Sequence, residues 1–365
     1  MKRFILMMAA VLALTASCGE RGYDPELSGS GFTIEADKLE ILADGTDYAQ
    51  ITAKYGNKEL TEDVAFYDAS SNVPVSVKSM RFSTKTPGQY DIFATYDGKK
   101  SNVLSINALE YSVPAVPADP DPSKTSFRKR VLLTQFTSTG CTYCPIIVGL
   151  LRELSNDKVY SDRFVLGASH ADMTDYPNGD DPASFSGVAE FMSTFDVRGF
   201  PTLTADLGES LSNYDLTTLK ALVDGCYSDG ISAAGIAASS VLIGNTLVVR
   251  AAVKAGETGN YRIGAWLLED GIYGKQTSAP DESYNTHNNC IRIINAGSSY
   301  MGHSVGRLAA GNSAEYILTF RNLDSQWKPD KCRLLLYVTS SVGNLNIVNN
   351  AVTLPLGGSV AYEYR

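Results

Sequence analysis

Hydrophobic and polar residues alternate in short runs through the early part of the chain, from Phe32 to Leu109. Alternation with a period of two places apolar side chains on one face of a β-strand. The runs are separated by dipeptides that favour tight turns, including Asp44-Gly45 and Asp97-Gly98. This spacing predicts a small β-sandwich over residues 32–110.

The pattern changes after a proline-rich stretch. Residues 113–122 hold four prolines in ten positions, which predicts an extended linker over residues 111–124. Beyond it, apolar runs typical of buried strands (Arg130 to Phe136, Arg163 to Ser169) flank a stretch with helical spacing (Pro145 to Leu154). This order predicts an α/β domain over residues 125–229. Alternating runs then return, and they predict a C-terminal β-sandwich over residues 230–365.

The composition fits a chain of several domains that does not bind nucleic acid. Its 365 residues exceed what a single core normally holds. With 31 Lys and Arg against 40 Asp and Glu, the formal net charge is −9. A chain without a basic surplus is poorly suited to neutralise a phosphate backbone, so the expected partners do not include nucleic acid.

The N-terminus indicates export. Lys2 and Arg3 precede eleven apolar residues, Phe4 to Leu14, which are too few to span a bilayer. The next residues, Thr15 to Cys18, resemble a bacterial lipobox, in which the cysteine is acylated after cleavage. The resemblance implies a signal peptide over residues 1–17, a lipid anchor on Cys18 and a tether over residues 18–31. A plain signal peptide with an incidental cysteine is the alternative.

The chemistry of the central domain lies in Cys141-Thr142-Tyr143-Cys144-Pro145, which follows a predicted strand and opens a predicted helix. Unsatisfied N–H groups and the helix dipole lower the pKa of a thiol at a helix N-terminus. Two intervening residues keep the second thiol within reach of the first, so a mixed disulfide on Cys141 can be resolved by Cys144.

A CxxC motif between a strand and a helix resembles the thioredoxin fold. Gly199-Phe200-Pro201-Thr202 is similar to the cis-proline loop of that fold. The resemblance implies that Cys141 is the attacking nucleophile, Cys144 the resolving thiol and Pro201 a cis-proline that shapes the substrate groove. Tyr143 and Phe200 are then neighbours of the redox site.

Two features depart from the thioredoxin pattern. Gln135 stands six residues before the first cysteine, where a buried carboxyl is usual, and Gly140 replaces the usual Trp. His170 ends a predicted strand, where it either tunes the CxxC motif or belongs to the polar rim. The acidic loop that follows, residues 170–184, is expected to be a solvated loop.

Alternatives to redox catalysis remain open. Zinc needs about four ligands, and the three histidines are scattered, so neither a metal nor another cofactor is expected. A structural disulfide that never cycles is favoured by export, and a fold used only for binding is favoured by Gln135. Cys226, Cys290 and Cys332 are left over; Cys290 and Cys332 either pair or stay reduced.

From about Phe127 to the end, the chain is similar to the twenty-eight-kilodalton outer-membrane-protein (Omp) family of Gram-negative lipoproteins, with the N-terminal sandwich as an accessory. The likeness is carried by residues 140–145, the strand ending at His170, and residues 199–202 and 284–292. The fold expected is an α/β thioredoxin-like central domain flanked by an N-terminal Ig-like β-sandwich and a C-terminal β-sandwich. The resemblance implies an outer-membrane lipoprotein that faces the periplasm or the cell surface. Two functions follow: thiol-disulfide exchange with extracytoplasmic proteins or a redox partner, or non-catalytic surface binding and adhesion on a thioredoxin scaffold. The residues do not decide whether the chain is an enzyme.

Overall fold

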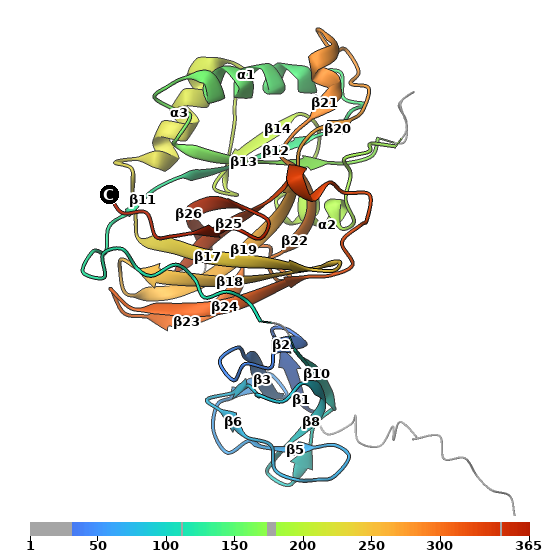
Figure 1. Cartoon of the computed structure of the whole chain (residues 1–365), viewed down its shortest axis with the longest axis vertical. Helices are drawn as coiled ribbons and strands as arrows, with labels where there is room; N and C mark the ends of the chain where they lie inside the picture. Colours follow the sequence, from blue (N-terminus) through green and yellow to red (C-terminus); the bar gives the residue numbers. More distant parts are fainter. Residues whose placement is uncertain (1–30, 111, 174–179, 344) are drawn as a thin grey trace, which may run out of the picture.

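The computed structural model describes residues 31–110, 112–173, 180–343 and 345–365. The expected signal peptide, Cys18 and nearly all of the expected tether lie outside these residues. The described chain forms a small β-sandwich and a larger body, joined by the proline-rich stretch (Figure 1). Within the described ranges, no helix is both long and apolar enough to cross a membrane.

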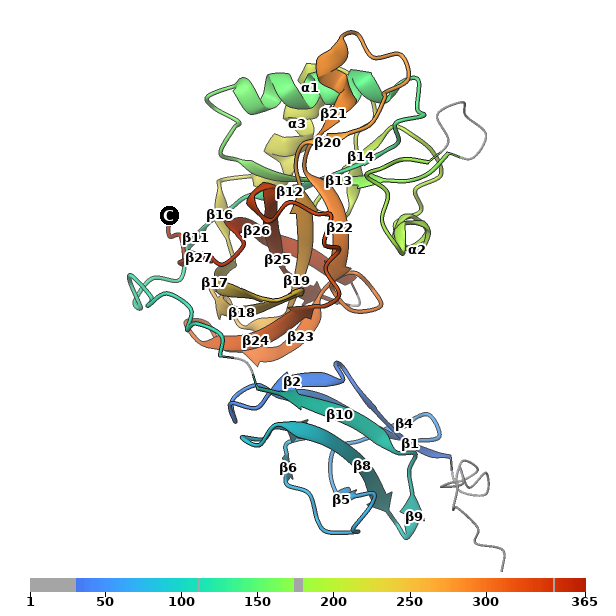
Figure 2. The ribbon, with the colours of Figure 1, turned by 45° about the vertical axis from the view of Figure 1, so that its right-hand side comes forward.

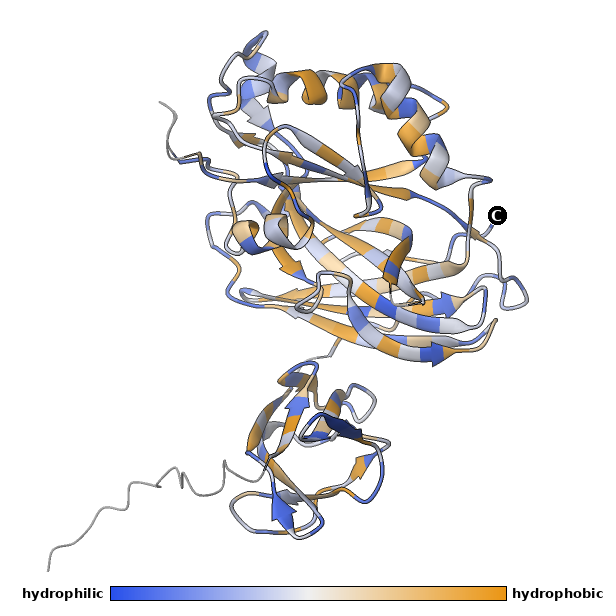
Figure 3. Ribbon diagram, turned by 180° about the vertical axis from the view of Figure 1, so that it is seen from behind, coloured by the Kyte–Doolittle hydropathy of each residue, from blue (hydrophilic) through white to orange (hydrophobic). Residues whose placement is uncertain are grey.

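The small sandwich consists of two five-stranded sheets, which share one core. One sheet has the order β1-β3-β7-β6 with β4 beside β3, and the other β2-β10-β8-β5 with β9 beside β8. Buried and more exposed residues alternate along β1 and β3, as the sequence pattern predicts. Figure 3 shows hydrophobic and hydrophilic residues interspersed along the strands of the small sandwich. The bounds are β1 Phe32–Ala36, β2 Glu40–Leu42, β3 Ala49–Tyr55, β4 Lys58–Leu60, β5 Ala65–Asp68, β6 Val77–Lys78, β7 Arg81–Phe82, β8 Gly88–Tyr96, β9 Lys99–Lys100 and β10 Leu104–Leu109.

The larger body contains a nine-stranded mixed sheet with the order β15-β14-β12-β13-β22-β19-β25-β26, in which β23 also pairs with β19. A four-stranded sheet, β24-β18-β17-β27, packs on the β19–β25–β26 part. Two short pairs, β11-β16 and β20-β21, complete it. The bounds are β11 Phe127–Arg128, β12 Val131–Thr137, β13 Phe164–His170, β14 Thr202–Ala205, β15 Glu209–Ser210, β16 Ile231–Ser232, β17 Ala234–Ile243, β18 Thr246–Ala255, β19 Gly259–Glu269, β20 Ile272–Tyr273, β21 Thr286–His287, β22 Cys290–Asn295, β23 His303–Leu308, β24 Ser313–Phe320, β25 Cys332–Val342, β26 Leu345–Pro355 and β27 Ser359–Val360.

The described residues contain three α-helices: α1 Cys144–Asn156, α2 Val188–Thr194 and α3 Leu216–Tyr227. Helices α1 and α3 lie at the end of the larger body farthest from the small sandwich (Figure 2). They cover one face of β12–β14, where Val131 and Leu133 pack against Ile147 and Leu219. Short 3₁₀ turns form at η2 Glu282–Asn285 and η3 Pro329–Lys331.

The predicted fold class, an α/β thioredoxin-like central domain flanked by an Ig-like and a C-terminal β-sandwich, is wrong. The described chain is mostly β, and the central strands do not form a sheet of their own. The free edge of β13 pairs with β22, with Ala168 opposite Cys290, so the sheet continues into the C-terminal strands. Local periodicity predicts a strand but does not reveal which distant strand pairs with it.

One core joins the central and C-terminal parts of the larger body. Trp266 on β19 is fully buried, and its ring lies 5.8 Å from Phe191 of α2 and 5.4 Å from Tyr337 of β25. Gly167 of β13 permits this packing, because a Cβ atom there would stand 2.6 Å from the Trp266 ring. The two parts therefore share side chains as well as a sheet.

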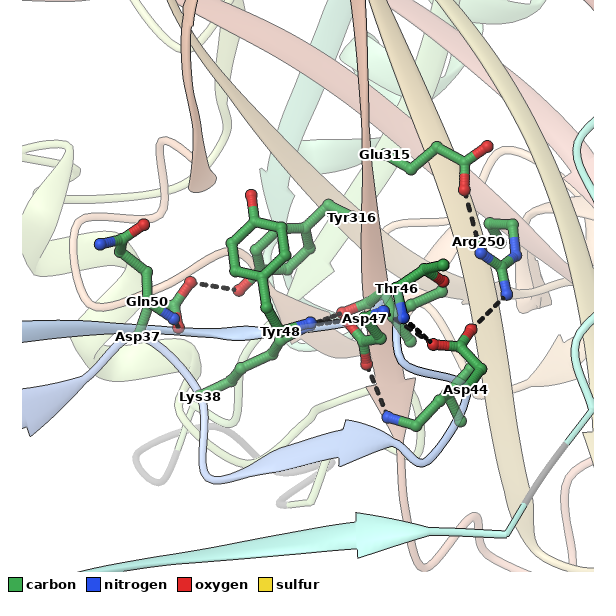
Figure 4. Close-up of polar contacts among 12 residues, drawn as sticks. Asp37, Lys38, Asp44, Thr46, Asp47, Tyr48, Gln50, Arg250, Glu315 and Tyr316 are labelled. Carbon is green, nitrogen blue, oxygen red and sulfur yellow. Dashed lines mark hydrogen bonds and ion pairs between the residues drawn. The ribbon is translucent and has the colours of Figure 1, made fainter. Parts of the chain in front are cut away.

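Ion pairs fix the small sandwich to the larger body (Figure 4). Arg250 of β18 binds Asp44 and Glu315, each at 2.9 Å, and its side chain is 13% exposed. Burial raises the pKa of Asp44, but backbone hydrogen bonds and Arg250 lower it to about 2. Lys38 pairs with Asp47 and also donates to the carbonyl of Ile317. The small sandwich is thus bound to the larger body by side-chain contacts of Lys38 and Asp44 as well as by the linker.

Replacing Arg250 by Met is expected to lower the free energy of unfolding by roughly 1–3 kcal/mol, because Asp44 and Glu315 lose their shared cation. Urea unfolding would measure the loss, and proteolysis of the linker should become faster. Arg198→Met is the matched control, since Arg198 and Asp196 are 84% and 77% exposed, and it should leave the urea midpoint unchanged. Equal effects of the two substitutions would contradict a structural role for Arg250.

Candidate redox site

The two cysteines of the CxxC motif are joined in a disulfide at the start of α1. The Cα atoms of Cys141 and Cys144 are 5.4 Å apart. Strand β12, buried along its whole length, delivers the chain to this point, and Pro145 occupies the first turn of the helix. Proline suits that position because its missing N–H is not needed there. The local prediction of strand, CxxC and helix is therefore confirmed.

The two cysteines of the disulfide are buried, although neighbouring side chains are exposed to solvent. Cys141 is 3% exposed and Cys144 fully buried, whereas Tyr143 is 64% and Ile146 46% exposed. The backbone N–H of Cys144 donates to Sγ of Cys141 at 3.1 Å. A helix N–H directed at this sulfur would stabilise a thiolate there after reduction. The arrangement favours Cys141 over Cys144 as the thiolate, and it leaves Tyr143 exposed beside the disulfide.

The peptide bond between Phe200 and Pro201 is cis. Strand β14 follows it and pairs antiparallel with β12, with Thr202 opposite Phe136. Since β12 leads to Cys141 within five residues, the cis-proline loop and the disulfide lie at the same end of the sheet. The hydroxyl of Tyr214 donates to the carbonyl of Pro201 at 2.7 Å and holds the loop. The role of Pro201 in shaping a substrate groove stays a prediction.

The segment between β20 and η2 forms hydrogen bonds to the loop that precedes Cys141. Gln276 is 5% exposed, and its Nε2 donates to the carbonyls of Cys141 at 3.0 Å and Thr139 at 3.1 Å. The N–H of Thr277 donates to the carbonyl of Thr139 at 2.8 Å. Sequence reasoning missed Gln276, because nothing near it in the sequence relates it to a loop about 135 positions earlier.

His170, at the end of β13, is buried and linked to the same loop. Its Nδ1 lies 2.9 Å from Oδ2 of Asp181, which also accepts the N–H of Thr139 at 2.7 Å. Burial lowers the pKa of His170, but interactions with Cys290 and Asp181 raise it to about 10. The resulting imidazolium holds the pKa of Asp181 below its usual value, against the effect of burial.

The expectation of a solvated acidic loop is wrong for Asp181, which is 4% exposed. Residues 174–179 of that loop lie outside the described residues. No pattern among its neighbours in the sequence marks Asp181 as buried, although Ala183, two residues later, is fully buried in the structure. His170 is thus connected to the CxxC loop through Asp181, and does not belong to a polar rim.

Gln135 is also buried, at 4% exposure, on the face of β12 that α1 covers. It lines a cavity of about 210 Å³ together with His170 and His287. No hydrogen-bond partner for its Nε2 exists among the described residues. Sequence reasoning recognised that Gln135 cannot titrate but not that it faces a cavity.

The leftover cysteines are reduced. Cys290 and Cys332 both lie opposite Glu269, on the two sides of β19. Two strand spacings, about 9–10 Å, separate them, which is too far for a disulfide. Burial raises the pKa of Cys226 to about 11 and that of Cys332 to about 12. Within the described ranges, no group of three or more His, Cys, Asp or Glu residues could hold a metal ion.

Comparisons with known proteins add a fold likeness. No family model matches the chain, and no curated protein matches it. Among solved structures, HBP35 of Porphyromonas gingivalis superimposes with a TM-score of 0.52 at 18% identity, over 64% of this chain and 77% of that one. A protein from Agrobacterium tumefaciens gives a TM-score of 0.43 at 14% identity, over 65% and 99%. At such identities, the match to HBP35 is a likeness of fold alone.

Proposed function

We propose that the chain exchanges thiols and disulfides with extracytoplasmic proteins through Cys141 and Cys144. The observation that carries the proposal is the disulfide at the start of α1, with the Cys144 N–H directed at Sγ of Cys141. The lipobox-like Cys18 supports an outer-membrane lipid anchor, and the resemblance to the Omp family supports the same location. Nothing in this function requires a cofactor.

In the reducing direction, the Cys141 thiolate attacks one sulfur of a substrate disulfide, and the other substrate sulfur leaves as a thiolate. The Cys144 thiolate then attacks Sγ of Cys141, which closes the Cys141–Cys144 disulfide and releases the second substrate thiolate. Two electrons have passed to the substrate, and a partner dithiol must return them. The oxidising direction runs through the same mixed disulfide in reverse.

Replacing Cys144 by Ser is expected to trap the mixed disulfide, because the resolving thiol is missing. The reduced variant, incubated with extracts of the cell envelope, should yield covalent adducts on non-reducing gels that disappear with reductant. Cys141→Ser is the control and should trap nothing, since Cys144 is fully buried. A Cys226→Ser background removes the one partly exposed leftover thiol. Absence of adducts, or equal adducts from both variants, would count against exchange at Cys141.

A second candidate function is non-catalytic binding at the cell surface, in which the Cys141–Cys144 disulfide only stabilises the fold. Cys141 is 3% exposed, and Gln276 holds the carbonyl beside it, which suits a disulfide that only stabilises the fold. In that case, its reduction potential should lie below about −300 mV. Equilibration of the purified chain with glutathione buffers distinguishes the two, because a cycling disulfide should be reduced at a higher potential.

A further inference from the structure

The thiol exchange proposed above makes no use of the cavity behind the CxxC helix. It lies between α1, the adjoining faces of β12 and β13, and residues 284–289. Its volume of about 210 Å³ has room for roughly seven waters or one small organic molecule. The wall toward the sheet and helix is partly aliphatic, with Leu151, Leu166 and Ala168. The cavity therefore suits a ligand that has both an apolar and a polar part.

Gln135 supplies a polar group that requires a partner. The side chain is 4% exposed, and its Nε2 has no hydrogen-bond partner among the described residues. Buried amide N–H groups in folded proteins are nearly always hydrogen-bonded. Leu133 and Thr137, two residues to either side on β12, place Gln135 on the face toward α1 by strand alternation. An occupant with an acceptor atom would satisfy this group.

The charged groups around the cavity favour an anion. Arg152 of α1 lines it and is held in place: its Nη1 and Nη2 donate to the hydroxyl and carbonyl of Ser283, at 2.9 Å and 3.0 Å. Its guanidinium also lies 4.1 Å from the ring centroid of Tyr284. No Asp or Glu is among the described lining residues. Two carboxylates lie outside the lining: Asp181 pairs with Nδ1 of His170, and Asp281 interacts electrostatically with Arg152 but accepts its hydrogen bond from Ser283.

Residues 284–289 form the wall of the cavity that packs against α1. Gly149 of α1 faces Tyr284, and a Cβ atom at Gly149 would stand 3.3 Å from the Tyr284 hydroxyl. The glycine thus permits the close approach of the tyrosine. The ring nitrogen Nε2 of His287 hydrogen-bonds to the carbonyl of Gly274, which anchors β21. The cavity is consequently a formed site and not a gap between loose segments.

We propose that this cavity binds a small organic carboxylate, whose oxygen accepts a hydrogen bond from Gln135 and whose charge is attracted by Arg152. The apolar part of the ligand rests against the aliphatic wall. This site is distinct from the Cys141–Cys144 disulfide, and the proposal does not depend on thiol exchange.

Titration calorimetry with benzoate on the full purified chain tests the proposal, with benzyl alcohol as the uncharged probe of the same shape. One benzoate should bind per chain, and benzyl alcohol should bind at least about tenfold more weakly. Gln135→Leu and Arg152→Gln should each weaken benzoate by about tenfold or more. Ala168→Leu, which fills the cavity, should abolish binding. Arg198→Gln removes an exposed arginine elsewhere and should change nothing.

Failure to bind benzoate at millimolar concentration would overturn the proposal, as would equal binding of benzyl alcohol. Benzoate binding that survives both Arg152→Gln and Ala168→Leu would place the ligand elsewhere and also overturn it. Arg152 is only partly buried, so that variant should fold even where Gln135→Leu does not. Thermal melts of each variant identify those that are folded. Because Cys144→Ser trapping is measured separately, the two proposals can fail independently.

Discussion

Replacing Asp181 by Asn is expected to cost about 3 kcal/mol of the free energy of unfolding at neutral pH. Oδ2 of Asp181 accepts the N–H of Thr139 and pairs with Nδ1 of His170, while Oδ1 accepts the N–H of Ala183. The substitution leaves His170 buried without the carboxylate that pairs with it, which is among the costlier changes in a protein interior. Urea unfolding followed by circular dichroism measures the loss.

Asp196→Asn is the matched control for Asp181→Asn, because Asp196 is 77% exposed and pairs with an exposed arginine. Its loss should stay within about 0.5 kcal/mol. Similar losses in the two variants would show that the Asp181–His170 pair contributes nothing to stability. Faster reduction of Cys141–Cys144 in Asp181→Asn alone would further indicate that Thr139 is held through this carboxylate.

The pair also predicts a pH dependence. Despite the opposing effect of burial, interactions with Cys290 and Asp181 raise the pKa of His170 to about 10 against 6.5, so the folded state binds this proton more tightly than the unfolded state. The contribution of protonated His170 to the free energy of unfolding is full below pH 6.5 and is lost as the pH rises through about 10. The lowered pKa of Asp181 contributes above its ordinary value of 3.8 and is lost as the pH falls through its folded-state value. The free energy of unfolding should fall less between pH 6.5 and about 10 in Asp181→Asn than in the unsubstituted chain.

Replacing Trp266 by Ala is expected to lower the free energy of unfolding by about 3–5 kcal/mol, since the ring is fully buried among Gly167, Phe191 and Tyr337. Because this core joins the central and C-terminal strands, the whole larger body should lose stability together. Two probes report on its two parts: thiol accessibility of Cys226 on α3, and fluorescence of Trp327 near η3. Both should show the same, lowered urea midpoint.

Tyr273→Ala serves as the aromatic control, because Tyr273 is 72% exposed, and its effect should be within about 0.5 kcal/mol. Trp266→Ala could lower the urea midpoint measured by Trp327 fluorescence and leave the midpoint measured by Cys226 accessibility unchanged. In that case, the two parts unfold independently. That result would contradict the shared core and support a separate central domain.

Local elements of the larger body were predictable because their signals are local. The apolar run predicted over 130–136 becomes β12, and the helical spacing of 145–154 lies within α1. The run over 163–169 becomes β13, shifted by one residue. Proline at the start of α1 and the two-residue spacing of the cysteines are properties of adjacent residues, so no tertiary information is needed to recognise them.

The candidate site was only partly predictable, for the same reason. The place of the cysteine pair at the start of a helix follows from the motif, and strand alternation places Gln135 on one face of β12. The carboxylate that pairs with His170 comes from a loop expected to be solvated, and Gln276 reaches Cys141 from a segment that folds back over it. The cavity exists only because residues 284–289 close on α1. No periodicity encodes contacts between segments so far apart.

By itself, the sequence determined an acidic chain with a turn-rich β region at each end and a cysteine pair at the start of a helix. Each of these is a consequence of composition or of neighbouring residues. Only the tertiary structure decided that β13 uses its second edge to pair with β22, which merges the expected domains into one sheet. A strand exposes the same hydrogen-bonding groups on both edges, so the partner of that edge is selected by packing across the whole body, with Trp266 at its centre.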